Sequence, residues 1–319
     1  MEIFINFLKV ILMGIVEGIT EWLPISSTGH MIILEQWIGL EGAMGSDLWE
    51  FFLVVIQLGA ILAVIVNFFS RLWPFGKNKT RKEKEDIRYV WLNIIIACVP
   101  AAIIGYFADD WLQSHLYNFI TVSLMLILYG VAFIVIETIF KKKKVSFKVC
   151  DVKEMSWKAA LVIGFAQVLA MIPGTSRSGV TILAAMLIGC DRKTSAEFSF
   201  FLSIPIMMGA SLLKGVKFVG SGSAVSGIQI AYILAGCVVA FAVSIIAIRL
   251  LLKFIKNNSF IGFGYYRIAL GLVLIVYYVV CINTGNGELV SSTTDVINLN
   301  YVNFSRVSSI VSNRLSICF

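Results

Sequence analysis

Long apolar stretches recur along this chain, with short polar loops between them. Six of the stretches are long enough to cross the hydrocarbon core of a bilayer as helices, which takes about 20 residues. The pattern therefore predicts an all-α polytopic membrane protein with about six transmembrane helices. The predicted spans are residues 47–70, 88–107, 116–140, 194–218, 226–252 and 260–282.

Two further apolar regions, residues 10–40 and 158–190, are each broken in the middle by Pro, Gly and a cluster of Ser and Thr. Backbone that leaves the helix inside a membrane must be buried in protein or line a wet cavity, because lipid cannot satisfy its polar groups. We therefore predict that both regions are re-entrant hairpins with the order helix, break, helix.

The two halves of the chain resemble each other at a constant offset of 150 residues. This offset predicts an internal duplication, with repeat one over about 1–140 and repeat two over about 158–283. The matched pairs are Gly14 with Gly164, Glu17 with Gln167, Ser26 with Ser176, Gly29 with Gly179, Gly59 with Gly209 and Ala60 with Ala210.

The distribution of Lys and Arg along the chain predicts how the helices are oriented in the membrane. The net charge of +7 does not indicate nucleic-acid binding, because most Lys and Arg fall in the short loops 71–88 and 141–158. Both loops are predicted to be cytoplasmic by the positive-inside rule. Span 47–70 then starts outside and its mate 194–218 starts inside. The repeats are thus inverted, their hairpins enter from opposite faces, and a site is expected near the midplane.

The composition supports a single membrane domain followed by a polar tail. Hydrophobic residues make up 59% of the chain and charged residues only 14%, against about a quarter charged in soluble domains. Residues 1–283 are predicted to form an integral membrane catalytic domain. Residues 284–319 are polar without clear periodicity, and we predict that this tail is disordered.

The first break lies within the segment EGITEWLPISSTGH. Glu17 and Glu21 are four residues apart, so they share one face of a helix. Acids within a membrane are usually functional, although two carboxylates at a helix end among lipid headgroups would be a structural alternative. Their charge makes them the candidate ligands of a divalent cation, Mg²⁺ or Ca²⁺.

Hydroxyls and an imidazole follow these acids. Ser27 is the candidate nucleophile, with Glu21 as the base that takes its proton. An alternative is that Glu21 activates a water and Ser27 only binds phosphate. Ser26 and Thr28 are candidate phosphate ligands, and His30 is a candidate acid or base.

The second break has the sequence PGTSRSGVT. Its Pro-Gly pair, which includes Gly174, ends one half-helix, and the free N–H groups at the start of the next half-helix suit an anion. Ser176, Ser178 and Thr181 add hydroxyl donors, and Arg177 adds a planar fork that matches phosphate oxygens. An arginine paired with an acid for stability alone would not need these hydroxyls. We therefore predict a phosphate-binding site, formed by these residues and Gly174.

Together these groups are typical of phosphoryl transfer, where positioning and charge neutralisation supply most of the catalysis. A site within the membrane favours a lipid phosphate as substrate. The catalytic residues expected on this basis are Glu21, Ser27, His30 and Arg177.

The segments GIVEGITEWLPISSTGH and MIPGTSRSGVTI resemble the two signature regions of the undecaprenyl-diphosphatase family of the bacitracin-resistance type. The resemblance covers about residues 1–280. It implies a bacterial plasma-membrane enzyme that hydrolyses undecaprenyl diphosphate to undecaprenyl phosphate and inorganic phosphate, recycling the lipid carrier for peptidoglycan synthesis. The functional positions that it implies here are Glu17, Glu21, Ser26, Ser27, His30, Ser176, Arg177, Ser178 and Thr181.

Two other functions are considered. Lipid phosphatases of the phosphatidic-acid type need a second histidine after a Ser-Arg pair, and no histidine follows His115 in this chain. A polyprenyl-phosphate flippase would use the same inverted repeats and the same anion site. The expected partners are the membrane, a lipid diphosphate and a second copy of the chain in a homodimer. The site is expected to open to the extracytoplasmic side.

Overall fold

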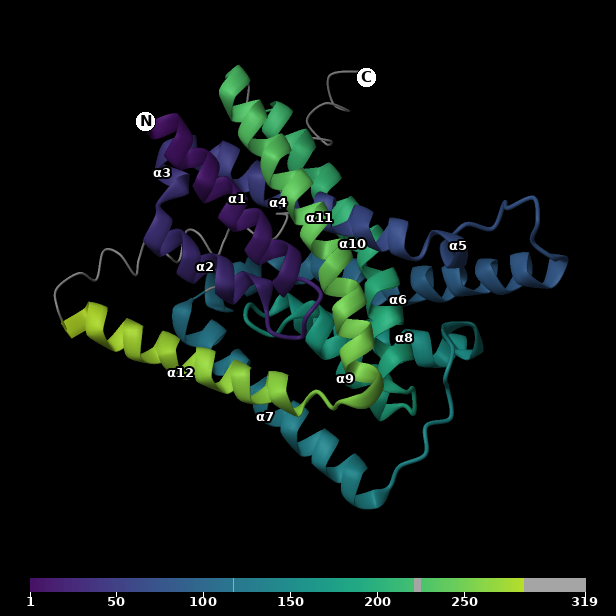
Figure 1. Cartoon of the computed structure of the whole chain (residues 1–319). Helices are drawn as coiled ribbons and strands as arrows, with labels where there is room; N and C mark the ends of the chain where they lie inside the picture. Colours follow the sequence, from purple (N-terminus) through teal and green to yellow (C-terminus); the bar gives the residue numbers. More distant parts are fainter. Residues whose placement is uncertain (117, 221–224, 284–319) are drawn as a thin grey trace, which may run out of the picture.

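The computed structural model describes residues 1–116, 118–220 and 225–283, so the predicted tail 284–319 lies outside the described residues. The described chain is helical, and its only strand-like feature is an isolated bridge between Val149 and Cys190. The α-helices are α1 Glu2–Thr20, α2 Ser27–Ile38, α3 Leu40–Met44, α4 Ser46–Asn67, α5 Phe69–Leu72, α6 Arg81–Leu116, α7 Phe119–Lys143, α8 Trp157–Val168, α9 Arg177–Leu187, α10 Arg192–Gly220, α11 Gly227–Asn257 and α12 Ile261–Asn283 (Figure 1).

The all-α polytopic architecture is confirmed, and the helix count is refined. Within the described chain, seven helices are long and apolar enough to cross a membrane. Six of them coincide with the predicted spans to within three residues or extend beyond them: α4, α6, α7, α10, α11 and α12. The seventh is α1, which was expected to start near residue 10 but begins at Glu2. The polar residues Asn6 and Lys9 did not end the apolar pattern, since Asn6 is buried against the protein.

Helices α1, α2 and α3 form a hairpin that returns to the face where it began (Figure 1). Near its start, the carbonyl of Ile3 accepts a hydrogen bond from the hydroxyl of Tyr232 at 3.3 Å. Near its end, the carbonyl of Met44 accepts one from the amide of Gln229 at 3.4 Å. Because Gln229 and Tyr232 both lie in the first turns of α11, the two ends of the hairpin lie at one face of the molecule.

Helices α8 and α9 form the second hairpin, at the other end of α11. Lys148, before α8, donates its N–H to the carbonyl of Gly189, after α9, at 2.9 Å. Close by, Glu137 binds the guanidinium of Arg192 at 2.5 Å and accepts the N–H of Phe260 at 2.9 Å. Phe260 follows α11, so the two hairpins enter from opposite faces of the bundle.

The two repeats interlock through matched glycines. A Cβ atom added to Gly14 of α1 would lie 2.8 Å from the carbonyl oxygen of Gly236 in α11. One added to Gly164 of α8 would lie 2.5 Å from the carbonyl oxygen of Ala97 in α6. Only glycine permits such close contact between helix backbones. Each hairpin therefore packs on a long helix of the opposite repeat, which brings both breaks to the middle of the bundle.

Candidate active site

The two breaks have the same backbone geometry at matched positions. Ser26 has φ 72° and Ser176 has φ 70°, in the left-handed region where a residue with a side chain is strained. Each serine caps the helix that follows it, because its hydroxyl accepts the N–H of Gly29 or of Gly179. The 150-residue offset of the sequence thus corresponds to a repeated turn that starts α2 and α9.

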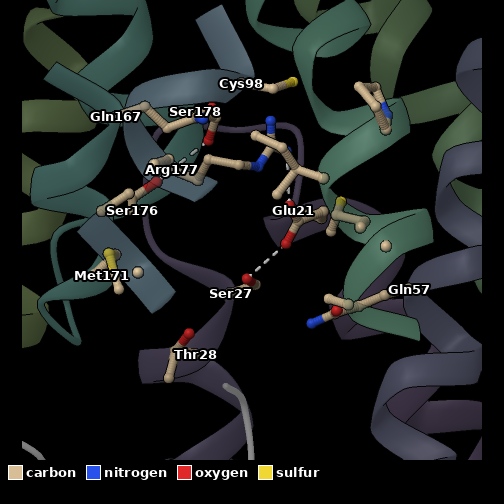
Figure 2. A pocket seen from close by; sticks show the side chains of 18 of the residues that line it. Glu21, Ser27, Thr28, Gln57, Cys98, Gln167, Met171, Ser176, Arg177 and Ser178 are labelled. Atoms are coloured by element: carbon tan, nitrogen blue, oxygen red, sulfur yellow. Dashed lines mark hydrogen bonds and ion pairs between the residues drawn. The ribbon is translucent and has the colours of Figure 1, made fainter. Parts of the chain in front are cut away.

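Both breaks line one cavity of about 350 Å³ (Figure 2). Its polar part comes from the two hairpins and from Gln57 of α4. Its apolar part comes mostly from α6 and α10 and includes Ala101, Gly105 and Leu213. Of the predicted site residues, the structure brings the following to this cavity: Glu21, Ser26, Ser27, Thr28, Gly174, Ser176, Arg177 and Ser178.

A chain of three side chains joins the two breaks across the cavity. The hydroxyl of Ser27 donates to Glu21 Oε2 at 2.7 Å, and Arg177 Nη2 binds Glu21 Oε1 at 2.8 Å (Figure 2). Glu21 is therefore placed to accept the proton of Ser27. Arg177 also donates from Nη1 to the carbonyl of Ser199 at 3.0 Å. These two bonds use two of the five N–H groups of the guanidinium and leave the others for a ligand.

The serines beside Arg177 also face one another and the first hairpin. The hydroxyls of Ser176 and Ser178 lie 3.2 Å apart, and Ser178 donates to the carbonyl of Leu23 at 3.2 Å. The start of α9 is thereby held against the first break. Hydroxyls, backbone N–H groups of two helix starts and a guanidinium meet in one place, which suits a phosphate group.

Three predicted site residues lie outside the lining of the cavity. His30 donates from Nδ1 to the carbonyl of Ser26 at 2.7 Å, and its Nε2 is hydrogen-bonded to the hydroxyl of Tyr266 at 2.6 Å. Thr181 donates to the hydroxyl of Ser199 at 2.7 Å and is fully buried. Glu17 is buried in α1, and its Oε1 has no hydrogen-bond partner among the described residues.

Arg267 of α12 is a site residue that the sequence analysis missed. It is 0% exposed and donates to the carbonyls of Pro24, Gly174 and Thr175 at 3.2, 2.9 and 3.0 Å. It therefore fixes both breaks in their irregular conformation. A charged residue within an apolar span is a functional signal, and that signal could have identified it.

The acids of the first hairpin offer a divalent cation few ligands. No group of three or more His, Cys, Asp and Glu side chains within the described part of the chain is arranged to hold a metal ion. Glu17 keeps one buried carboxylate oxygen without a partner, whereas both oxygens of Glu21 are engaged. A cation held by the protein here would need oxygens of the substrate to complete its coordination.

Comparisons with known proteins find a matching family model and similar curated proteins. Residues 10–273 match the family model of the bacitracin resistance protein BacA. Curated relatives carry the name undecaprenyl-diphosphatase. The one from Enterococcus faecalis is 52% identical over 276 residues, which is 86% of this chain and 99% of the relative. Those from Acetivibrio thermocellus and Streptococcus mutans are 50% identical, over 86% of this chain and 98% and 97% of the relatives.

Proposed function

Because the chain belongs to the bacitracin resistance protein BacA family, we propose that it hydrolyses undecaprenyl diphosphate to undecaprenyl phosphate and inorganic phosphate. This reaction would return the lipid carrier to peptidoglycan synthesis. The observation that carries the proposal is the hydrogen-bonded chain of Ser27, Glu21 and Arg177 at a cavity within the bundle.

The residues divide into two roles. Arg177, the hydroxyls beside it and the start of α9 hold the terminal phosphoryl group. Glu21 takes the proton of Ser27 as the Ser27 oxygen attacks phosphorus and the bond to the bridging oxygen breaks. Undecaprenyl phosphate leaves, and a water then attacks the phosphoserine to release inorganic phosphate. The apolar wall of the cavity suits the start of the lipid chain.

Purified protein in detergent tests this function directly. It should release inorganic phosphate from undecaprenyl diphosphate over many turnovers, although no second compartment is present. A flippase uses the same inverted hairpins but has no hydrolytic step. Protein that binds the lipid diphosphate and releases no phosphate would therefore contradict the phosphatase and favour the flippase.

We also propose that a divalent cation, Mg²⁺ or Ca²⁺, takes part in this reaction, with Glu17 and Glu21 as its protein ligands. The cation would neutralise charge on the diphosphate, which Arg177 balances only in part. The unpartnered oxygen of Glu17 supports this role. Thorough chelation should remove most of the phosphate release, and either cation should restore it. Activity that survives chelation unchanged would exclude the cation.

The site is proposed to open to the extracytoplasmic side of a bacterial plasma membrane, because the first hairpin would enter from that face. Thr28 lines the cavity at the start of α2 (Figure 2). Thr28→Cys should react with an impermeant thiol reagent added to intact cells. The background must lack Cys98, which lines the same cavity. Labelling only from the cytoplasmic side would reverse this orientation.

A further inference from the structure

Gln167, near the end of α8, has no role in the chemistry described so far. Its side chain lines the cavity, as Figure 2 shows, and it is only 3% exposed. Neither Nε2 nor Oε1 of its amide has a hydrogen-bond partner among the described residues. Both ends of this amide are therefore available to a molecule in the cavity.

The fold alone gives no reason for an amide at this position. A buried polar group without a partner lowers stability, whereas an apolar side chain of the same shape would not. The neighbouring lining residues Cys98, Ala101, Ala170 and Met171 are apolar or weakly polar. An unbranched apolar side chain would suit this environment, whereas a ligand with polar atoms in the cavity would give the amide its hydrogen-bond partners.

The matching position in the first repeat indicates which kind of ligand Gln167 binds. Position 167 corresponds to Glu17 in the first hairpin. A carboxylate only accepts hydrogen bonds and repels an anion, whereas a neutral amide donates from its nitrogen. The second hairpin thus places a donor where the first places an acid. That donor lies on the same hairpin as Arg177 and the start of α9.

The position of Gln167 indicates which phosphate it contacts. Helix α8 packs on α6, whose residues Cys98, Ala101, Ala102 and Gly105 line the apolar part of the cavity. Helix α8, which carries Gln167, thus packs on both α9, with its phosphate-binding residues, and α6, with the wall that suits the lipid. Given the proposed hydrolysis, we propose that Gln167 Nε2 donates to an oxygen of the lipid-linked phosphate, the group that leaves as undecaprenyl phosphate.

The test is Gln167→Met, which keeps the length of the side chain and removes its hydrogen bonds. We expect KM for undecaprenyl diphosphate to rise about 10-fold, as for the loss of one hydrogen bond to a charged group. Inhibition by undecaprenyl phosphate should weaken by a similar factor, and inhibition by inorganic phosphate should not change. The melting temperature should stay equal or rise, because an unpaired buried amide is removed.

Asn93→Leu is the matched control, because the nitrogen of this buried amide has a structural partner, although its oxygen has none among the described residues. Its Nδ2 donates to the carbonyl of Met155 at 2.7 Å, away from the cavity lining. This variant should melt at a lower temperature with unchanged KM. An unchanged KM in Gln167→Met would overturn the proposal, whether or not the melting temperature falls as in Asn93→Leu. Inhibition by inorganic phosphate that weakens as much as inhibition by undecaprenyl phosphate would also overturn it. Absence of phosphate release by the wild-type protein would instead overturn the proposed function.

Discussion

Replacing Glu21 by glutamine is expected to lower phosphate release about 1,000-fold, the range typical of a lost general base. The carboxylate accepts hydrogen bonds from Ser27 at 2.7 Å and from Arg177 at 2.8 Å. Glutamine has one oxygen for these two donors. If that oxygen stays on Arg177, the amide N–H₂ faces Ser27 and cannot take its proton. Phosphate release by purified protein, with kcat and KM measured separately, checks this prediction.

The fold should survive this change. Removing one partner of a buried ion pair is costly when the other charge stays buried and unpaired. Arg177, however, borders the cavity, where water or the substrate can reach its free N–H groups. Glu21→Gln should therefore remain monodisperse and melt close to the wild-type temperature. Aggregation of the variant would instead indicate that the Glu21–Arg177 pair is structural.

Glu137→Gln provides the matched control for this variant. Glu137 is also a buried acid paired with an arginine, but it joins α7 to Arg192 and to the N–H of Phe260 away from the cavity. The same substitution there should lower the melting temperature clearly and leave the activity of the folded protein near the wild-type value. The two variants thus separate a chemical role from a structural one.

The architecture of the chain could be predicted from the sequence because membrane helices follow local rules. Apolar length predicted the six spans, and the polar breaks predicted the two hairpins. The constant offset predicted the shared turn at Ser26 and Ser176. The start of α1 was placed too late, because burial of Asn6 depends on packing against other helices.

The site could be predicted only where it depends on local sequence. Glu21, Ser27 and Arg177 were identified because each lies in or next to a break, and the breaks meet. The partners of His30 and Thr181 could not be predicted. Tyr266 is 236 residues from His30, and Ser199 reaches Thr181 only through the packing of α10 on α9. Such contacts depend on which helices are neighbours, and apolar periodicity does not contain that information.

Ser27→Ala is expected to abolish turnover, because we propose that the hydroxyl of Ser27 attacks the terminal phosphorus. Ser27 is the first residue of α2, and its hydroxyl already donates to Glu21 Oε2 at 2.7 Å. Deprotonation therefore needs no rearrangement, and Arg177 beside Glu21 can hold the phosphoryl group as the bond forms. Rapid acid quench of the wild-type protein, with substrate labelled in its terminal phosphate, should yield a phosphorylated peptide that contains Ser27.

The rival mechanism has Glu21 activate a water, with Ser27 as a phosphate ligand only. It forms no covalent species and leaves Ser27→Ala with a measurable rate, because the base and Arg177 remain. Thr28→Ala is the control, since Thr28 also lines the cavity but has no hydrogen bond to Glu21 within the described structure. It should be slower than wild type and still form the phosphopeptide. Turnover by Ser27→Ala without any phosphopeptide in the wild type would assign the attack to water and leave the phosphatase function intact.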